Sequence, residues 1–159
     1  MVLPLDIDAP VTAEVFTLTR DGDHLRLTGP CGPEPWLIET DRSEHPLDAV
    51  RRIVESAVGE PILLHSTSWR FDRQSVILTF VVVLPDPGAM DSRAVDRAEL
   101  ARSTQTSAPS AIVTGQVLEH AIRHLAWLAA EDAVVGDALD PGWHDILSRY
   151  VPEPFRQLE

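Results

Sequence analysis

The apolar run at residues 75–84 limits the choice of fold more than any other segment of the chain. It reads Ser-Val-Ile-Leu-Thr-Phe-Val-Val-Val-Leu, rich in β-branched residues and apolar at both odd and even positions. Because alternate residues of a strand point to opposite faces of its sheet, this strand must be covered on both sides. We therefore expect an α/β (α+β) protein, with a sheet between layers of helices.

The segments before this strand predict further sheet elements and one helix. Val15–Thr19 and His24–Thr28 alternate in hydropathy around a turn-forming Asp-Gly-Asp, which predicts a hairpin, and Trp36–Glu39 predicts a short strand. Pro46 suits the first turn of a helix, and an apolar stripe at helical spacing ends at Gly59. The spacing thus predicts a helix of about three turns.

The second half of the sequence is predominantly helical in pattern. Ile62–Trp69 predicts one more strand, and a long amphipathic pattern from Ala111 to about Val135 predicts the longest helix. Pro141 predicts the start of a last helix, which ends near Tyr150. Residues 85–111 form an irregular connection with at most a short amphipathic turn at Ala94–Arg102. We interpret 1–159 as a single domain with a C-terminal helical extension at 111–159.

Composition excludes several classes of function. The chain has 159 residues and a net charge of −12, and all 13 basic residues are arginine. Lysine and asparagine are both absent, as a very GC-rich genome would produce. The absence of lysine excludes a phosphate-binding Walker lysine and Schiff-base chemistry. The acidic balance disfavours nucleic-acid binding. A single cysteine, Cys31, and the lack of a long apolar segment lead us to expect a cytoplasmic protein that does not enter a membrane.

The order of these elements and the residues at 44–59 resemble the Nudix family. The Nudix box reads G-x5-E-x7-R-E-U-x-E-E-x-G-U, where U is a bulky apolar residue. Placing the second glycine of the box on Gly59 puts its first glutamate on Glu44, its arginine on Arg52 and an apolar position on Val54, without a gap. The resemblance implies a Nudix-like mixed β-sheet sandwiched between α-helices.

Only four of the nine specified positions of the box agree, since the first glycine falls on Ile38 and the last apolar position on Glu60. The other departures concern the residues on which the family's chemistry depends. The three glutamates that follow the arginine fall on Ile53, Ser56 and Ala57. In the family these glutamates hold Mg²⁺ or Mn²⁺ beside a diphosphate. We therefore expect no cofactor or metal, and a protein that acts by binding a small ligand or a protein partner. The alternative is a hydrolase that uses non-standard carboxylates with Mg²⁺ or Mn²⁺, for which Glu44 and Glu55 are the first suspects.

Four residues are candidates for binding an anionic small molecule. Arg52 lies in the box, and His65, Trp69 and Arg70 follow one another along the strand before the apolar run. An indole offers a flat face for stacking, and a guanidinium binds oxyanions through two parallel hydrogen bonds. A purely structural interpretation is also open: Trp69 packs in the core, Arg70 forms an ion pair, and Arg52 pairs with Asp48 or Glu55 on the helix surface.

His120, His124, Trp127 and Glu131 form one ridge of the long helix. Two histidines four residues apart can share a metal ion, and this gives His120, His124 and Glu131 as a weaker alternative metal site. Histidines beside a buried stripe more often pack against another helix or subunit. The remaining alternative is therefore a homodimeric interaction module that uses this ridge.

Overall fold

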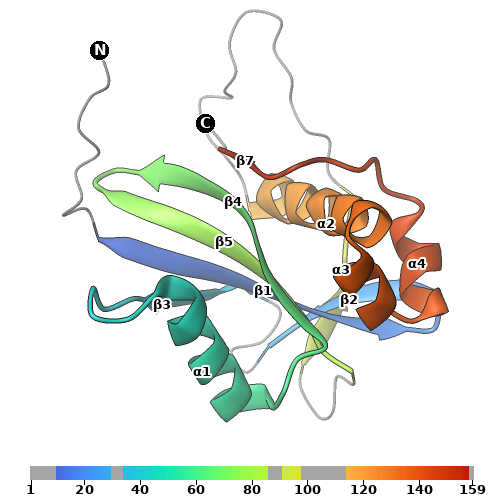
Figure 1. The fold of residues 1–159 in the computed structure, drawn as a ribbon, viewed down its shortest axis with the longest axis horizontal. Helices are drawn as coiled ribbons and strands as arrows, with labels where there is room; N and C mark the ends of the chain where they lie inside the picture. Colours follow the sequence, from blue (N-terminus) through green and yellow to red (C-terminus); the bar gives the residue numbers. More distant parts are fainter. Residues whose placement is uncertain (1–9, 30–33, 86–90, 98–113, 158–159) are drawn as a thin grey trace, which may run out of the picture.

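The computed structural model describes residues 10–29, 34–85, 91–97 and 114–157. Strands dominate the first two thirds of the described chain and helices the last third (Figure 1). In chain order the elements are β1 (Val11–Asp21), β2 (His24–Thr28), β3 (Trp36–Glu39), α1 (Pro46–Val58), β4 (Leu63–Asp72), β5 (Ser75–Val83), β6 (Ser92–Ala94), α2 (Thr114–Glu131), α3 (Ala133–Ala138), α4 (Pro141–Leu147) and β7 (Arg156–Gln157).

The described strands form one mixed sheet in the order β6-β2-β1-β5-β4-β7. Its two central strands, β1 and β5, are parallel, and β2 and β4 pair with them in antiparallel fashion. On the same edge of β1, β2 pairs with the second half of the strand and β3 with the first half. The expected hairpin, the Trp36–Glu39 strand and the strand at the apolar run are confirmed.

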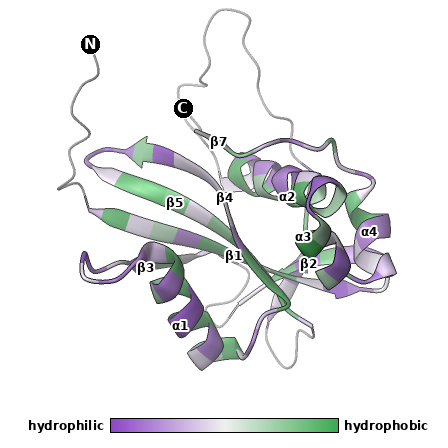
Figure 2. Cartoon of the chain, in the orientation of Figure 1, coloured by the Kyte–Doolittle hydropathy of each residue, from purple (hydrophilic) through white to green (hydrophobic). Residues whose placement is uncertain are grey.

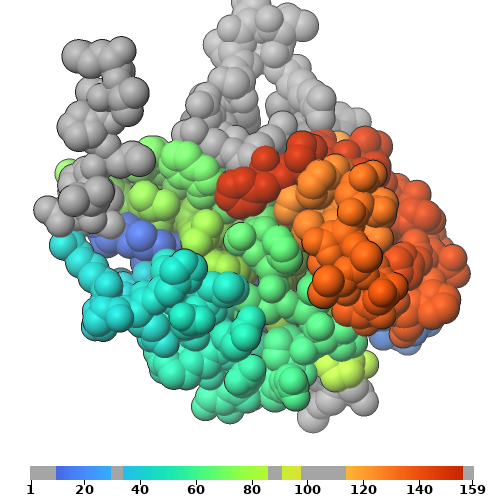
Figure 3. Space-filling view, viewed as in Figure 1, coloured from blue at the N-terminus to red at the C-terminus, as the bar shows by residue number. Residues whose placement is uncertain are grey.

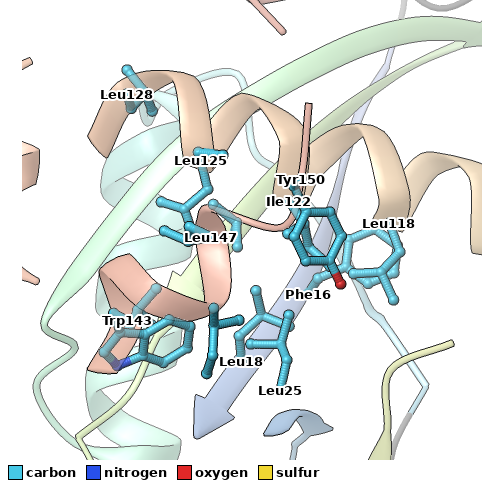
Figure 4. Packing of buried hydrophobic residues seen from close by; sticks show 14 of the residues in the cluster. Phe16, Leu18, Leu25, Leu118, Ile122, Leu125, Leu128, Trp143, Leu147 and Tyr150 are labelled. Atoms are coloured by element: carbon cyan, nitrogen blue, oxygen red, sulfur yellow. The ribbon is translucent and has the colours of Figure 1, made fainter. Parts of the chain in front are cut away.

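Helices cover both faces of the sheet, as the apolar run predicts. On one face α2 and α4 pack over β1 and β2, where Phe16, Leu18 and Leu25 point toward Ile122 and Leu147 (Figure 4). On the other face Val50 and Val54 of α1 pack on the remaining apolar residues of β1, β3 and β5. In Figure 2 β5 is coloured mostly as hydrophobic, whereas α1 has both hydrophilic and hydrophobic bands. The sheet is therefore the middle layer of the molecule.

Helix α1 begins and ends where the sequence predicts. The His45 side chain accepts a hydrogen bond from the backbone N–H of Leu47, and Pro46 occupies the first turn, where its missing N–H costs nothing. At the other end Gly59 has a φ of 90°, a conformation that favours glycine, and its N–H donates to the Glu55 carbonyl.

Several elements differ from expectation. Helix α4 ends at Leu147 and not near Tyr150. The long helix runs over 114–131 and not to Val135, because the carboxylate of Asp132 accepts hydrogen bonds from two backbone N–H groups and starts α3. A short strand, β6, lies within the stretch expected to be irregular, and the tail adds β7 beside β4. The amphipathic turn expected at Ala94–Arg102 falls largely outside the described residues. None of the described helices combines the length and the hydropathy of a membrane span.

Candidate functional site

The box-like segment is held together by an ion pair between Glu44 and Arg52. Arg52 Nε and Nη2 donate to the two carboxylate oxygens of Glu44 at 3.2 and 2.9 Å. These hydrogen bonds lower the pKa of Glu44 and raise that of Arg52. Within the described chain Arg52 therefore pairs with Glu44, and the pairs expected with Asp48 and Glu55 are not formed. The predicted ligand-binding arginine already has a carboxylate partner.

The helix surface around this pair lacks the oxygen donors of a magnesium site. Ile53 is partly buried and packs toward the sheet, while Ser56 and Ala57 are exposed. Glu55 is exposed as well. Part of α1 lies at the surface of the molecule in the view of Figure 3. A hard divalent cation prefers several carboxylate or carbonyl oxygens, which an isoleucine and an alanine cannot supply. The residues present do not fit the metal centre that the resemblance implies.

Arg70, the second predicted anion-binding arginine, forms an ion pair across the central strand. Its guanidinium donates to both carboxylate oxygens of Glu14 at 2.9 and 3.1 Å, and the Thr79 hydroxyl donates to the same carboxylate at 3.2 Å. Glu14 is only 5% exposed. Arg70 therefore has a structural role, because it neutralises a buried carboxylate. The guanidinium N–H groups that an external anion would need already donate to Glu14.

His65 and Trp69, the other two predicted ligand residues, lie on opposite faces of β4. The His65 ring packs near His124 of α2, with ring centroids 6.1 Å apart, and its Nδ1 lies 3.0 Å from the Ser66 carbonyl. Trp69 is half-buried and makes an edge-on contact with the exposed Phe71. The structure therefore does not bring the two side chains together into one binding surface.

The two histidines of the α2 ridge are buried within the chain. His120 is fully buried, with Nδ1 3.2 Å from Glu153 Oε2 and Nε2 3.3 Å from the Thr67 carbonyl. His124 is 2% exposed, and its Nδ1 donates to the Glu153 carbonyl. Burial lowers the pKa of His124. Both imidazoles thus contact the chain's own C-terminal segment at Glu153, and Glu131 lies apart at the exposed end of the helix.

Three glutamates of the described chain that the sequence did not single out are buried: Glu14, Glu119 and Glu153. Glu119 pairs with both Arg97 and Arg123, and Arg123 also donates to Glu153, which anchors the C-terminal segment on α2. Glu14 lies among the buried residues of β1, and Glu119 among those of α2. A charged residue inside a mostly apolar stretch is the sequence feature that could have indicated these buried glutamates. No group of three or more histidine, cysteine or acidic residues in the described chain is arranged to hold a metal ion.

A pocket of about 280 Å³ lies between α2 and α4, away from the box-like helix. Alanines of α2 form one wall, and His144, Leu147 and Tyr150 form the other. None of the residues that we expected to bind a ligand lines this pocket.

The mixed sheet between two helical layers and the position of α1 define a Nudix-like fold. No protein-family model and no curated protein matches the sequence. Among solved structures, the chain is similar to the crystal structure of NrtR from Shewanella oneidensis, a Nudix-family protein. The TM-score is 0.55 and the sequence identity 15%, over 91% of this chain and 80% of that one. A likeness at this identity establishes the fold alone.

Proposed function

We propose that this protein uses a Nudix-like fold to bind a small ligand and does not hydrolyse diphosphates with a metal ion. The observation that supports the proposal is a contrast within the box-like segment, between the residues that match the box and those that replace its glutamates. Glu44 and Arg52, which match the box, form an ion pair, and Gly59, which also matches it, ends the helix. The three positions aligned with the family's glutamates hold Ile53, Ser56 and Ala57.

The remaining carboxylates of this region are poor substitutes. Both oxygens of Glu44 accept hydrogen bonds from Arg52, so a cation at Glu44 would have to displace a guanidinium. Glu55 is one residue from the box position, and one residue turns a side chain by about 100° around the helix axis. Moving Glu55 into position would also rotate the buried Val50 and Val54 away from the sheet.

A hydrolysis assay over nucleoside diphosphate derivatives, with Mg²⁺ and then Mn²⁺, tests the proposal. We expect turnover by the wild-type protein to equal that of a protein-free control. Glu44→Gln and Glu55→Gln are the informative variants, and Glu60→Gln is the matched control at an exposed position just outside the helix. Metal-dependent turnover that either of the first two variants abolishes and Glu60→Gln retains would refute the proposal in favour of a hydrolase with non-standard carboxylates.

A further inference from the structure

Unpartnered polar side chains gather on one face of the sheet. In the described chain, four buried side-chain atoms have no hydrogen-bond partner: Thr17 Oγ1, Thr19 Oγ1, Trp36 Nε1 and Ser68 Oγ. The first three belong to the neighbouring strands β1 and β3. Buried polar groups of native proteins almost always have a partner, so a cluster of unpartnered ones on one surface marks a place where the polar atoms of a ligand can bind.

The strand register places these three side chains together. Alternate residues of a strand share a face, so Thr17 and Thr19 continue the row of Ala13 and Val15 on the α1 side of the sheet. Trp36 lies directly across from Val15 and packs in the same cluster. Thr17 is its diagonal neighbour, roughly 7 Å away at the Cβ atoms. Trp36 and the two threonines thus lie together on one buried surface of the sheet, and each of these residues is 6% exposed or less.

Arg26 adds a positive charge to this face. It lies directly across from Thr19 on β2, so its side chain leaves the sheet on the same side. The guanidinium is partly buried, and its Nε and Nη2 donate to the side chain and the carbonyl of Ser92 at 3.1 and 3.0 Å. No carboxylate among the described residues pairs with it. In contrast, an acidic side chain pairs with each of Arg20, Arg52, Arg70, Arg97, Arg123 and Arg149.

We propose that Thr17, Thr19, Trp36 and Arg26 form a binding site for a small molecule with a phosphate or carboxylate group. An indole N–H can only donate, a hydroxyl can donate, and a guanidinium brings both charge and N–H groups, so all four side chains complement the oxygens of an anion. The inference rests on the proposed ligand-binding function and gives that function a place and a ligand class. It also replaces the predicted arginines Arg52 and Arg70, whose donors are occupied by glutamates.

Titrations of the full chain with inorganic phosphate, AMP and succinate test the site, and the three probes separate a phosphate from a carboxylate ligand. The readout is the indole N–H resonance of Trp36 in ¹⁵N NMR spectra, identified with Trp36→Phe. We expect a saturable shift with at least one probe, and a Kd at least about tenfold weaker in Arg26→Gln. Absence of a saturable shift with all three probes would overturn the anion site.

Matched threonine variants test whether the hydroxyls are unpartnered. Thr17→Val and Thr19→Val remove a hydroxyl at nearly constant shape and should weaken binding while raising Tm by about 2–4 °C each. Thr79→Val is the control: Thr79 is equally buried, but its hydroxyl donates to Glu14, so this variant should lower Tm and leave binding unchanged. A fall in Tm in all three variants would overturn the proposal. Anion binding that survives Arg26→Gln and Thr19→Val would overturn this site and leave the proposed function standing, whereas metal-dependent turnover would refute the function.

Discussion

Glu14 is a carboxylate buried in the middle of the sheet, and Arg70 is its only guanidinium partner in the described chain. Arg70→Met should leave the Glu14 charge uncompensated and lower the free energy of unfolding by about 3–5 kcal/mol. Urea unfolding monitored by tryptophan fluorescence measures this change. The double variant Glu14→Leu/Arg70→Met removes both charges and should recover most of the loss. A cost below about 1 kcal/mol for Arg70→Met alone would show that the pair does not stabilise the sheet.

His124 makes stability depend on pH. Burial lowers the pKa of its imidazole below the ordinary 6.5, so the unfolded chain takes up a proton more readily than the folded one. The resulting stability is fully present above pH 6.5 and is lost as the pH falls through the lowered folded pKa. We expect His124→Asn, which retains a donor for the Glu153 carbonyl, to reduce this loss in urea unfolding at a series of pH values. The exposed His24 is the control, and an equal effect of His24→Gln would contradict the assignment.

At the level of elements, Asp132 separates α2 from α3. Its carboxylate accepts hydrogen bonds from the N–H groups of Val134 and Val135 at 2.9 and 3.2 Å. Asp132→Ala should lower the free energy of unfolding by about 1 kcal/mol, the usual effect of losing an N-cap. Asp137→Ala, at an exposed position later in α3, is the matched control and should change stability much less. Equal effects of the two variants in thermal unfolding would show that the cap does not matter.

The elements that periodicity could predict are those with a long buried face. The hairpin, α1 and β5 each carry such a face, and the structure confirms them. Strands β6 and β7 are only three and two residues long, so they carry almost no pattern and are specified by pairing with β2 and β4. The end of α2 was missed because the apolar spacing continues past Asp132, although its side chain caps the next helix.

At the scale of the whole molecule, the composition shows that arginine supplies every basic side chain. It does not show which guanidinium groups lack an acidic partner. The sequence alone suggested Arg52 and Arg70 as anion contacts because they lie in a motif and beside an aromatic residue. Their partners, Glu44 and Glu14, are eight and 56 residues away in sequence, so only the fold reveals that both arginines are already neutralised. Arg26 lies in no recognisable motif. It becomes a candidate anion-binding residue only because the sheet register places it beside the unpartnered hydroxyls of Thr17 and Thr19.

The proposed function requires that the box-like helix α1 holds no catalytic metal ion. Calorimetric titration of the full chain with Mn²⁺ tests this most directly, because binding does not depend on guessing a substrate. We predict no stoichiometric site with a Kd in the micromolar range, and the same weak signal in the wild type, Glu44→Gln and Glu55→Gln. A single saturable Mn²⁺ site that Glu44→Gln or Glu55→Gln removes would show that the protein does bind a metal ion through these carboxylates and would refute the proposed function.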